Sequence, residues 1–227
     1  MAYDTSGALY IANWSGGTIE RFTPAGDREV FADGLSGPSG LAISANGVVF
    51  AASYSGNVVW RFTNAGKPEV FVDGLSTPAG LSFNSAGELL IANRETNEIL
   101  AADSNGRTRV VATGLQTPVG AVELDNGDLI VSNINGGISR VPAGDTRALT
   151  INSELRSPAP GIARAGGDAA YVADYGGSTV DLITRDGKRT TVADGFRSPT
   201  SIAIAPDGRL AIADWGTNSL YVIKPVH

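Results

Sequence analysis

The sequence predicts an all-β protein, a six-bladed β-propeller built from four-stranded antiparallel blades of about 40 residues each. A proline and a turn glycine each recur at intervals of about 40 residues, which indicates a structural repeat. Short apolar runs separated by turn signals fill each interval, and no segment shows the 3.6-residue period of a helix. The prolines are Pro38, Pro78, Pro118, Pro158 and Pro199, and the glycines are Gly7, Gly47, Gly87, Gly127, Gly167 and Gly208.

Each unit is expected to contain four strands in the same order. The first follows the proline, as in "GLAIS" (40–44), and ends at a turn such as "SAG" or "PDG" that favours a hairpin. The second is an apolar run such as "ELLIAN" (88–93), and "NEILAAD" (97–103) and "RVVATGL" (109–115) represent the third and fourth. Such a unit cannot bury both faces alone, so neighbouring units must stack around an axis.

The repeats form one domain, and the arithmetic at its ends predicts an incomplete last blade. Six units of about 40 residues need about 240 residues, whereas the chain has 227. The last unit stops after its third strand, "SLYVI" (219–223), so we expect a three-stranded sixth blade, or one completed by another chain. Its open edge could also support edge-to-edge self-association. The expected blades are approximately 1–37, 38–77, 78–117, 118–157, 158–198 and 199–227.

Composition excludes several classes of function. The formal net charge is −6, and an acidic chain repels phosphate backbones, so nucleic acid is not expected as a partner. There is no cysteine, and His227 is the only histidine, which excludes thiolate zinc sites, a Cys nucleophile, a His-based triad and a multi-His metal site. No apolar stretch reaches the roughly 18–20 residues of a membrane span, so no membrane partner is expected.

The sequence leaves the cellular compartment of the protein undetermined. The first residues, "MAYDTSGALY", lack the basic start and apolar block of a signal peptide. The chain as written is therefore expected to be cytoplasmic, or periplasmic or secreted if a signal peptide has been removed.

The repeated phrase "P-x-G-L/I-A … D/N-G-x-L-x-I-A-D/N … N-x-I" resembles the NHL repeat and its six-bladed relatives. These relatives are the families of gluconolactonase (SMP-30), strictosidine synthase and streptogramin lyase type. Residues 57–93 carry the phrase best, and the resemblance covers essentially the whole chain. It implies a six-bladed propeller, and among the activities found on that fold are hydrolysis of lactones and lyase chemistry.

The sequence departs from these families where their functional residues would stand. RNA-binding NHL domains carry a basic face, whereas this chain is acidic, and streptogramin lyases use a histidine base that this chain does not offer. The lactonases of this superfamily hold a divalent ion with a Glu, Asn and Asp set near the starts of inner strands. That ligand set does not carry over, because the matching positions are Ser39, Ala79, Val119, Ala159 and Thr200.

The end of each second strand carries a small polar residue, and six loops should bring these residues into one ring. One interpretation is turn chemistry, in which the side-chain oxygen accepts hydrogen bonds from backbone N–H groups. The other is a crown of oxygens that holds Ca²⁺ or Mg²⁺. The ring consists of Asn13, Ser53, Asn93, Asn133, Asp174 and Asp214, of which all but Ser53 are candidate metal ligands.

The next position varies more, and it is the candidate ligand-binding set. Aromatic residues cluster on neighbouring blades, where they could cap the seams between blades or form an aromatic-walled contact surface. The candidate ligand-binding residues are Trp14, Tyr54, Arg94, Tyr175 and Trp215; Ile134 occupies the same position in the fourth blade.

One inner-strand position changes from apolar to charged in adjacent blades. Ile43 and Ile204 hold it elsewhere, but Glu123 and Arg164 hold it in the fourth and fifth blades. A mutual Glu123–Arg164 ion pair is one explanation. The other is a catalytic carboxylate in the channel, for which Glu123 is the candidate.

Two functions therefore remain open, and so does the question whether the chain is an enzyme. The first is a binding propeller that presents its loops near the axis to a small molecule, a peptide or a protein, without a cofactor. The alternative is a metal-dependent lactonase, another hydrolase or a lyase, with Ca²⁺ or Mg²⁺ at the channel mouth.

Overall fold

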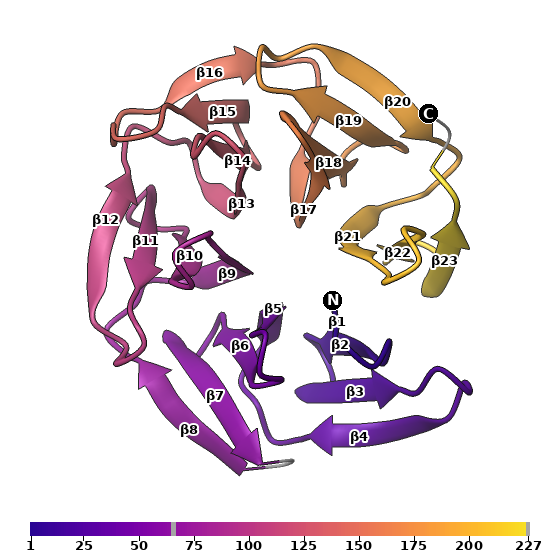
Figure 1. Ribbon diagram of the computed structural model, residues 1–227. Helices are drawn as coiled ribbons and strands as arrows, with labels where there is room; N and C mark the ends of the chain where they lie inside the picture. Colours follow the sequence, from indigo (N-terminus) through magenta and orange to yellow (C-terminus); the bar gives the residue numbers. More distant parts are fainter. Residues whose placement is uncertain (65–66, 226–227) are drawn as a thin grey trace.

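The computed structural model describes residues 1–64 and 67–225, and every regular element within them is a β-strand. Antiparallel sheets stand around a central axis as the blades of a propeller (Figure 1). The first three sheets contain β1 (Ala2–Tyr3), β2 (Leu9–Asn13), β3 (Thr18–Phe22) and β4 (Arg28–Ala32); β5 (Pro38–Ile43), β6 (Val49–Ser53), β7 (Val58–Asn64) and β8 (Lys67–Val72); and β9 (Pro78–Phe83), β10 (Leu89–Asn93), β11 (Glu98–Ala102) and β12 (Thr108–Ala112).

The last three sheets complete the ring and confirm the predicted six-bladed fold. The sixth has three strands, as expected, and β23 is its outermost strand in the part of the chain that the structure describes. These sheets contain β13 (Pro118–Glu123), β14 (Leu129–Asn133), β15 (Gly137–Val141) and β16 (Leu149–Asn152); β17 (Pro158–Gly166), β18 (Ala169–Asp174), β19 (Val180–Thr184) and β20 (Arg189–Ala193); and β21 (Pro199–Ile204), β22 (Leu210–Asp214) and β23 (Ser219–Ile223).

Burial falls from the second strand of a blade to the fourth. All five residues of β10 are buried, whereas three of the five in β12 are exposed. A second strand has neighbouring blades on both faces and therefore reads as a continuous apolar run, while an outer strand faces solvent and carries charged residues. No helix among the described residues could cross a membrane.

The hydrophobic core is divided among the seams between blades. Each buried cluster combines residues of two adjacent blades, as the repeat pattern requires. Phe50 illustrates this, because its ring lies edge-on to Phe71 of its own blade and to Phe83 of the next, with ring centroids 4.9 and 5.6 Å apart. At the closure of the ring, Leu9 packs with Ala203 and Ala211.

The inner strands approach one another closely. A side-chain carbon on Gly40 would lie 2.3 Å from the carbonyl oxygen of Ala79 in the next blade, so only glycine fits there. At the closure, the amino group of Met1 lies 3.0 Å from Oγ of Ser201, which joins the first blade to the sixth.

The fifth blade carries the extra residue of the longest repeat interval. β17 has nine residues, and its register with β18 shifts between Pro158 and Ile162. Pro160 lies inside this shift, where its missing N–H costs no ladder hydrogen bond.

The strand register defines two faces of the ring. Pro118 pairs with Asn133, whereas Glu123 pairs with Leu129 at the other end of the same strands. We call the first end the loop face, because the segment entering each blade and the loop between its second and third strands meet there. The opposite end, with the turns between first and second strands, is the hairpin face.

Candidate functional site

The polar residue that ends each second strand lies on the loop face, and from blade two onward its side chain joins two loops of its own blade. Five of the six are buried, and Asn13 is exposed. The N–H of Ser76 donates to Oδ1 of Asn93 at 2.8 Å, and the N–H of Gln116 donates to Oδ1 of Asn133 at 3.1 Å. These bonds join the end of the second strand to the segment that enters the same blade.

Asp174 and Asp214 join the same two segments of their blades, and each accepts N–H bonds with both carboxylate oxygens. Asp214 accepts N–H bonds from Arg197 at 2.9 Å, Ser198 at 2.8 Å and Gly216 at 3.0 Å. Burial by itself raises the pKa of Asp214, but these backbone N–H groups outweigh it and leave the pKa below its ordinary value. Asp174 accepts from Arg156 at 3.1 Å and from Ser157 at 2.8 Å.

These hydrogen bonds occupy the oxygens that would have to bind the expected divalent cation. The oxygens of Asn93, Asn133, Asp174 and Asp214 accept N–H bonds within their own blades. Within residues 1–64 and 67–225, no three or more Asp, Glu, His or Cys side chains form a metal-ligand cluster. A hard cation needs several free oxygens around one point, so the ring in this conformation does not fit one. The proposed metal-ligand role of these residues stays a prediction.

The first group of expected ligand-binding residues spans blades one to three. The ring of Trp14 lies edge-on to that of Tyr54, with centroids 6.2 Å apart. The guanidinium of Arg94 lies 5.6 Å from the centroid of Tyr54 and donates to its hydroxyl oxygen. Trp14 also covers Gly37, since a side-chain carbon there would lie 2.9 Å from Nε1 of the indole. Trp14 thus caps a seam, yet 53% of its surface stays exposed.

The second group lies on blades five and six. Tyr175 and Trp215 stack with centroids 5.9 Å apart and an interplanar angle of 26°. Trp215 is 63% exposed, the largest exposed fraction among the exposed large hydrophobic residues. The structure therefore places the five candidate residues in two contact groups, Trp14–Tyr54–Arg94 and Tyr175–Trp215.

Two arginines that the sequence reasoning did not select stand beside the second group. Arg156 and Arg197 each lie two residues before a repeat proline, where earlier blades have Ser36 and Ser76. The stem of Arg197 crosses the loop of blade six, because a side-chain carbon on Gly216 would lie 2.7 Å from its Cβ. The stem of Arg156 approaches Gly176 in the same way, at 3.3 Å. The replacement of the repeat's serine by arginine was the feature of the sequence that could have identified these two residues.

These arginines have no ion-pair partner in the described part of the chain, unlike Arg140, Arg185 and Arg189 in the same half of the molecule. Two sets of positions surround the aromatic groups: the residue that follows each second strand, and the residue two positions before each repeat proline. Together they include three arginines and no carboxylate. They are Trp14, Tyr54, Arg94, Ile134, Tyr175 and Trp215, with Ser36, Ser76, Gln116, Arg156 and Arg197. An acidic chain thus presents cationic side chains around its aromatic groups.

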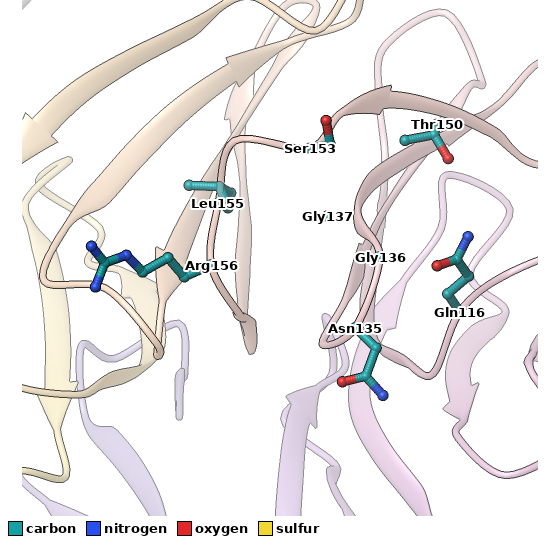
Figure 2. A pocket seen from close by; sticks show the side chains of 8 residues that line it. All are labelled: Gln116, Asn135, Gly136, Gly137, Thr150, Ser153, Leu155 and Arg156. Carbon is teal, nitrogen blue, oxygen red and sulfur yellow. The ribbon is translucent and has the colours of Figure 1, made fainter.

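A polar cavity of about 410 Å³ opens between blades four and five (Figure 2). Its side chains come from the entry segments of the two blades, the blade-four loop and β16, and Figure 2 shows Arg156 at one end and Gln116 and Thr150 at the other. The cavity adjoins the second aromatic group, since the N–H of Arg156 bonds Asp174, which precedes Tyr175. It is lined by Gln116, Asn135, Gly136, Gly137, Thr150, Ser153, Leu155 and Arg156.

A shorter loop accounts for this cavity. The seams that follow blades two and three are each bridged by an asparagine with positive φ, because Oδ1 of Asn57 accepts the N–H of Thr77 at 2.9 Å and Asn97 accepts that of Thr117 at 2.8 Å. In blade four the positive-φ residue is Gly137, with φ 71°, and it has no side chain to bridge the seam. The sequence signal for this opening was the combination of a missing asparagine and a loop one residue shorter, "NINGGI" (133–138), because blade one has Gly17 at this position in a loop of full length.

Glu123 lies on the hairpin face, five residues along β13 from Pro118. At about 3.3 Å per residue, this places it about 16 Å from the loop face. Its Oε2 accepts the N–H of Ser85, and Arg164 pairs with Asp125. The expected Glu123–Arg164 pair is therefore wrong, because each side chain reaches a nearer partner. The proposed catalytic role of Glu123 stays a prediction, but it cannot belong to the same site as the aromatic groups.

Comparison with known proteins identifies the fold. No family model and no curated protein sequence matches the chain. Among solved structures, a gluconolactonase from Xanthomonas campestris shares 16% identity over 99% of this chain and 84% of its own, with a TM-score of 0.83. Virginiamycin B lyase from Staphylococcus aureus shares 18% identity over 98% of this chain and 82% of its own, with a TM-score of 0.75. Likeness at this identity shows that the chain shares the six-bladed propeller fold of these enzymes, as the sequence resemblance implied.

Proposed function

We propose that the loop face binds an organic anion that carries a flat apolar group. One observation supports this most directly: Trp215, 63% exposed and stacked on Tyr175, stands beside two arginines that have no carboxylate partner among the described residues. The ligand would be a small molecule or an exposed group of a peptide or protein.

The aromatic groups would supply most of the contact area. An exposed indole that already rests on a second ring loses little conformational freedom when a ligand covers it, which makes Trp and Tyr effective contact residues. Trp14 offers a second surface of this kind on blade one, the neighbour of blade six across the ring closure.

The arginines would select the charge of the ligand. A guanidinium binds a carboxylate or phosphate with two parallel N–H bonds, and it also packs against aromatic faces. The cavity beside Arg156 adds amide and hydroxyl groups that could hold polar atoms of the same ligand, and its volume of about 410 Å³ falls in the range of small-molecule sites.

The test is a charge series on one aromatic core: naphthalene acetate, the neutral naphthalene ethanol and the cationic naphthalene ethylamine, titrated and followed by tryptophan fluorescence and calorimetry. We expect the anion to bind tightest and its affinity to fall with added salt. Trp215→Ala should abolish binding, and Arg197→Gln should weaken only the anion. Val110→Ala, an exposed apolar residue of β12 on the outer rim, is the matched control. Equal affinity for the three probes, or binding that survives Trp215→Ala, would contradict the proposal.

The enzymatic alternative, a metal-dependent lactonase, hydrolase or lyase, is supported by fold likeness to such enzymes. Its candidate residues are divided between the two faces, and the loop-face carboxylates already accept N–H bonds. Calorimetric titration of chelator-treated protein with Ca²⁺ and Mg²⁺ tests this reading. One micromolar site per chain that is lost in Asp174→Asn would favour the enzyme, whereas the present geometry leads us to expect none.

A further inference from the structure

The outer strand of the sixth blade exposes side chains that the other blades bury. Leu220 pairs with Ala213, and the residues in the same register of the other third strands are fully buried. Leu220 is 40% exposed, and the next two residues, Tyr221 and Val222, are 39% and 45% exposed. The five buried counterparts are Ile19, Val59, Ile99, Ile138 and Val180.

This difference in exposure arises because the other blades have a fourth strand that covers the third, whereas the described part of the sixth blade has none. In blade two, Val59 pairs with Val72 of β8, and the chain then places buried Leu75 beside it. In the described chain nothing pairs with the outer edge of β23, so its backbone groups and the Leu220 side chain lack this cover. An unpaired edge with exposed apolar residues is a template for another strand.

β23 also lacks the charges that protect outer edges elsewhere. Its five residues are Ser219, Leu220, Tyr221, Val222 and Ile223, and none is charged. β4, β8, β12 and β20 each contain a charged residue, which hinders pairing with another chain. β16 is uncharged, but its four residues follow a segment that already bridges Thr113 through Arg147.

We propose that the partner of this edge is β23 of a second copy of the chain, paired antiparallel about a two-fold axis at Tyr221. In this register Leu220 faces Val222, Ser219 faces Ile223, and Lys224 faces Asn218. Apolar and aromatic pairs therefore meet across the edge, and no like charges are opposed despite the net charge of each copy. The resulting sheet would contain six strands, three from each copy.

The geometry of the ring permits this contact. Figure 1 shows β23 at the outer rim, with β22 and β21 between it and the axis. The paired copies would extend the blade outward, away from the axis where the loops converge. This self-association is therefore independent of ligand binding at the loop face.

The first test is the molar mass of the chain across a concentration series, by light scattering or sedimentation. We expect a reversible dimer whose dissociation constant rises by about tenfold or more in Val222→Lys, because a charge on an edge strand opposes pairing. Leu149→Lys in β16 is the matched control, since Leu149 is 47% exposed on the other uncharged outer strand. A monomer at all concentrations, or a dimer that only Leu149→Lys disrupts, would overturn the proposal.

Cysteine capture then tests the register, because the chain has no cysteine of its own. The two Tyr221 positions face each other at the distance a disulfide needs, so Tyr221→Cys should form a covalent dimer under mild oxidation. The two Ser219 positions would lie four residues apart along the strands, about 14 Å, so Ser219→Cys should not. Capture through Ser219→Cys but not Tyr221→Cys would refute the register. Monomers that instead bind a peptide copied from residues 68–75 would show that the edge takes a different partner.

Discussion

Replacing Asp214 by alanine tests whether the repeated polar residue serves the fold. Three backbone N–H groups, those of Arg197, Ser198 and Gly216, donate to this buried carboxylate at 2.8–3.0 Å. A buried donor left unpaired costs about 1–3 kcal/mol, and water can reach part of this loop. We therefore expect Asp214→Ala to lower the free energy of unfolding by at least about 3 kcal/mol.

The same change in other blades supplies graded controls. Asp174 accepts two N–H bonds and should cost less, whereas exposed Asn13 accepts one, from Gly16, and should cost under about 1 kcal/mol. Urea unfolding followed by tryptophan fluorescence measures all three, with the denaturant slope as a check on the transition. If Asp214→Ala costs no more than Asn13→Ala, the carboxylate is not a structural fastener and the reasoning fails.

Three further changes test other parts of the structure. Because the pKa of Asp214 is lowered from 3.8 in the folded protein, its carboxylate stabilises the fold above that pH and the contribution is lost as pH falls through the folded pKa. Acid unfolding of Asp214→Asn should therefore depend less on pH below about 4 than that of the parent chain. Arg189→Met should cost about 3 kcal/mol, since it leaves the fully buried Asp181 carboxylate without its ion-pair partner, while Arg109→Met, whose pair with Glu88 is exposed, should cost under about 1 kcal/mol. Equal costs of the two, measured by urea unfolding, would contradict the burial argument. Gly216→Ala should displace Arg197 and weaken binding of naphthalene acetate several-fold while the neutral probe binds as before; an equal loss for both probes would show that the arginine does not select charge.

The repeat determines most of the fold, for a local reason. Each unit contains its own hairpin turns and apolar runs, so the periodicity of Pro38 to Pro199 predicts strands, blades and their stacking without long-range information. The incomplete sixth blade follows from the same count. The extra residue of blade five also shows in the spacing, but only the register of β17 shows that Pro160 absorbs it.

The candidate site was predicted in part. The ring positions of Trp14, Tyr54, Arg94, Tyr175 and Trp215 follow from the repeat, whereas their division into two groups depends on side-chain directions that no spacing reveals. Arg156 and Arg197 differ visibly from Ser36 and Ser76 in the repeat, but only the structure shows that their side chains lie against the loops of Tyr175 and Trp215.

The number of blades and the order of their strands follow from the amino-acid sequence alone, because a repeat encodes its local geometry in every unit. Which side chains contact one another became clear only from the folded structure. It separated Glu123 from the aromatic groups, paired Arg164 with Asp125, and divided the aromatic residues into two contact groups. Those outcomes depend on distances between residues far apart in the chain, and they are fixed only when six blades close around one axis.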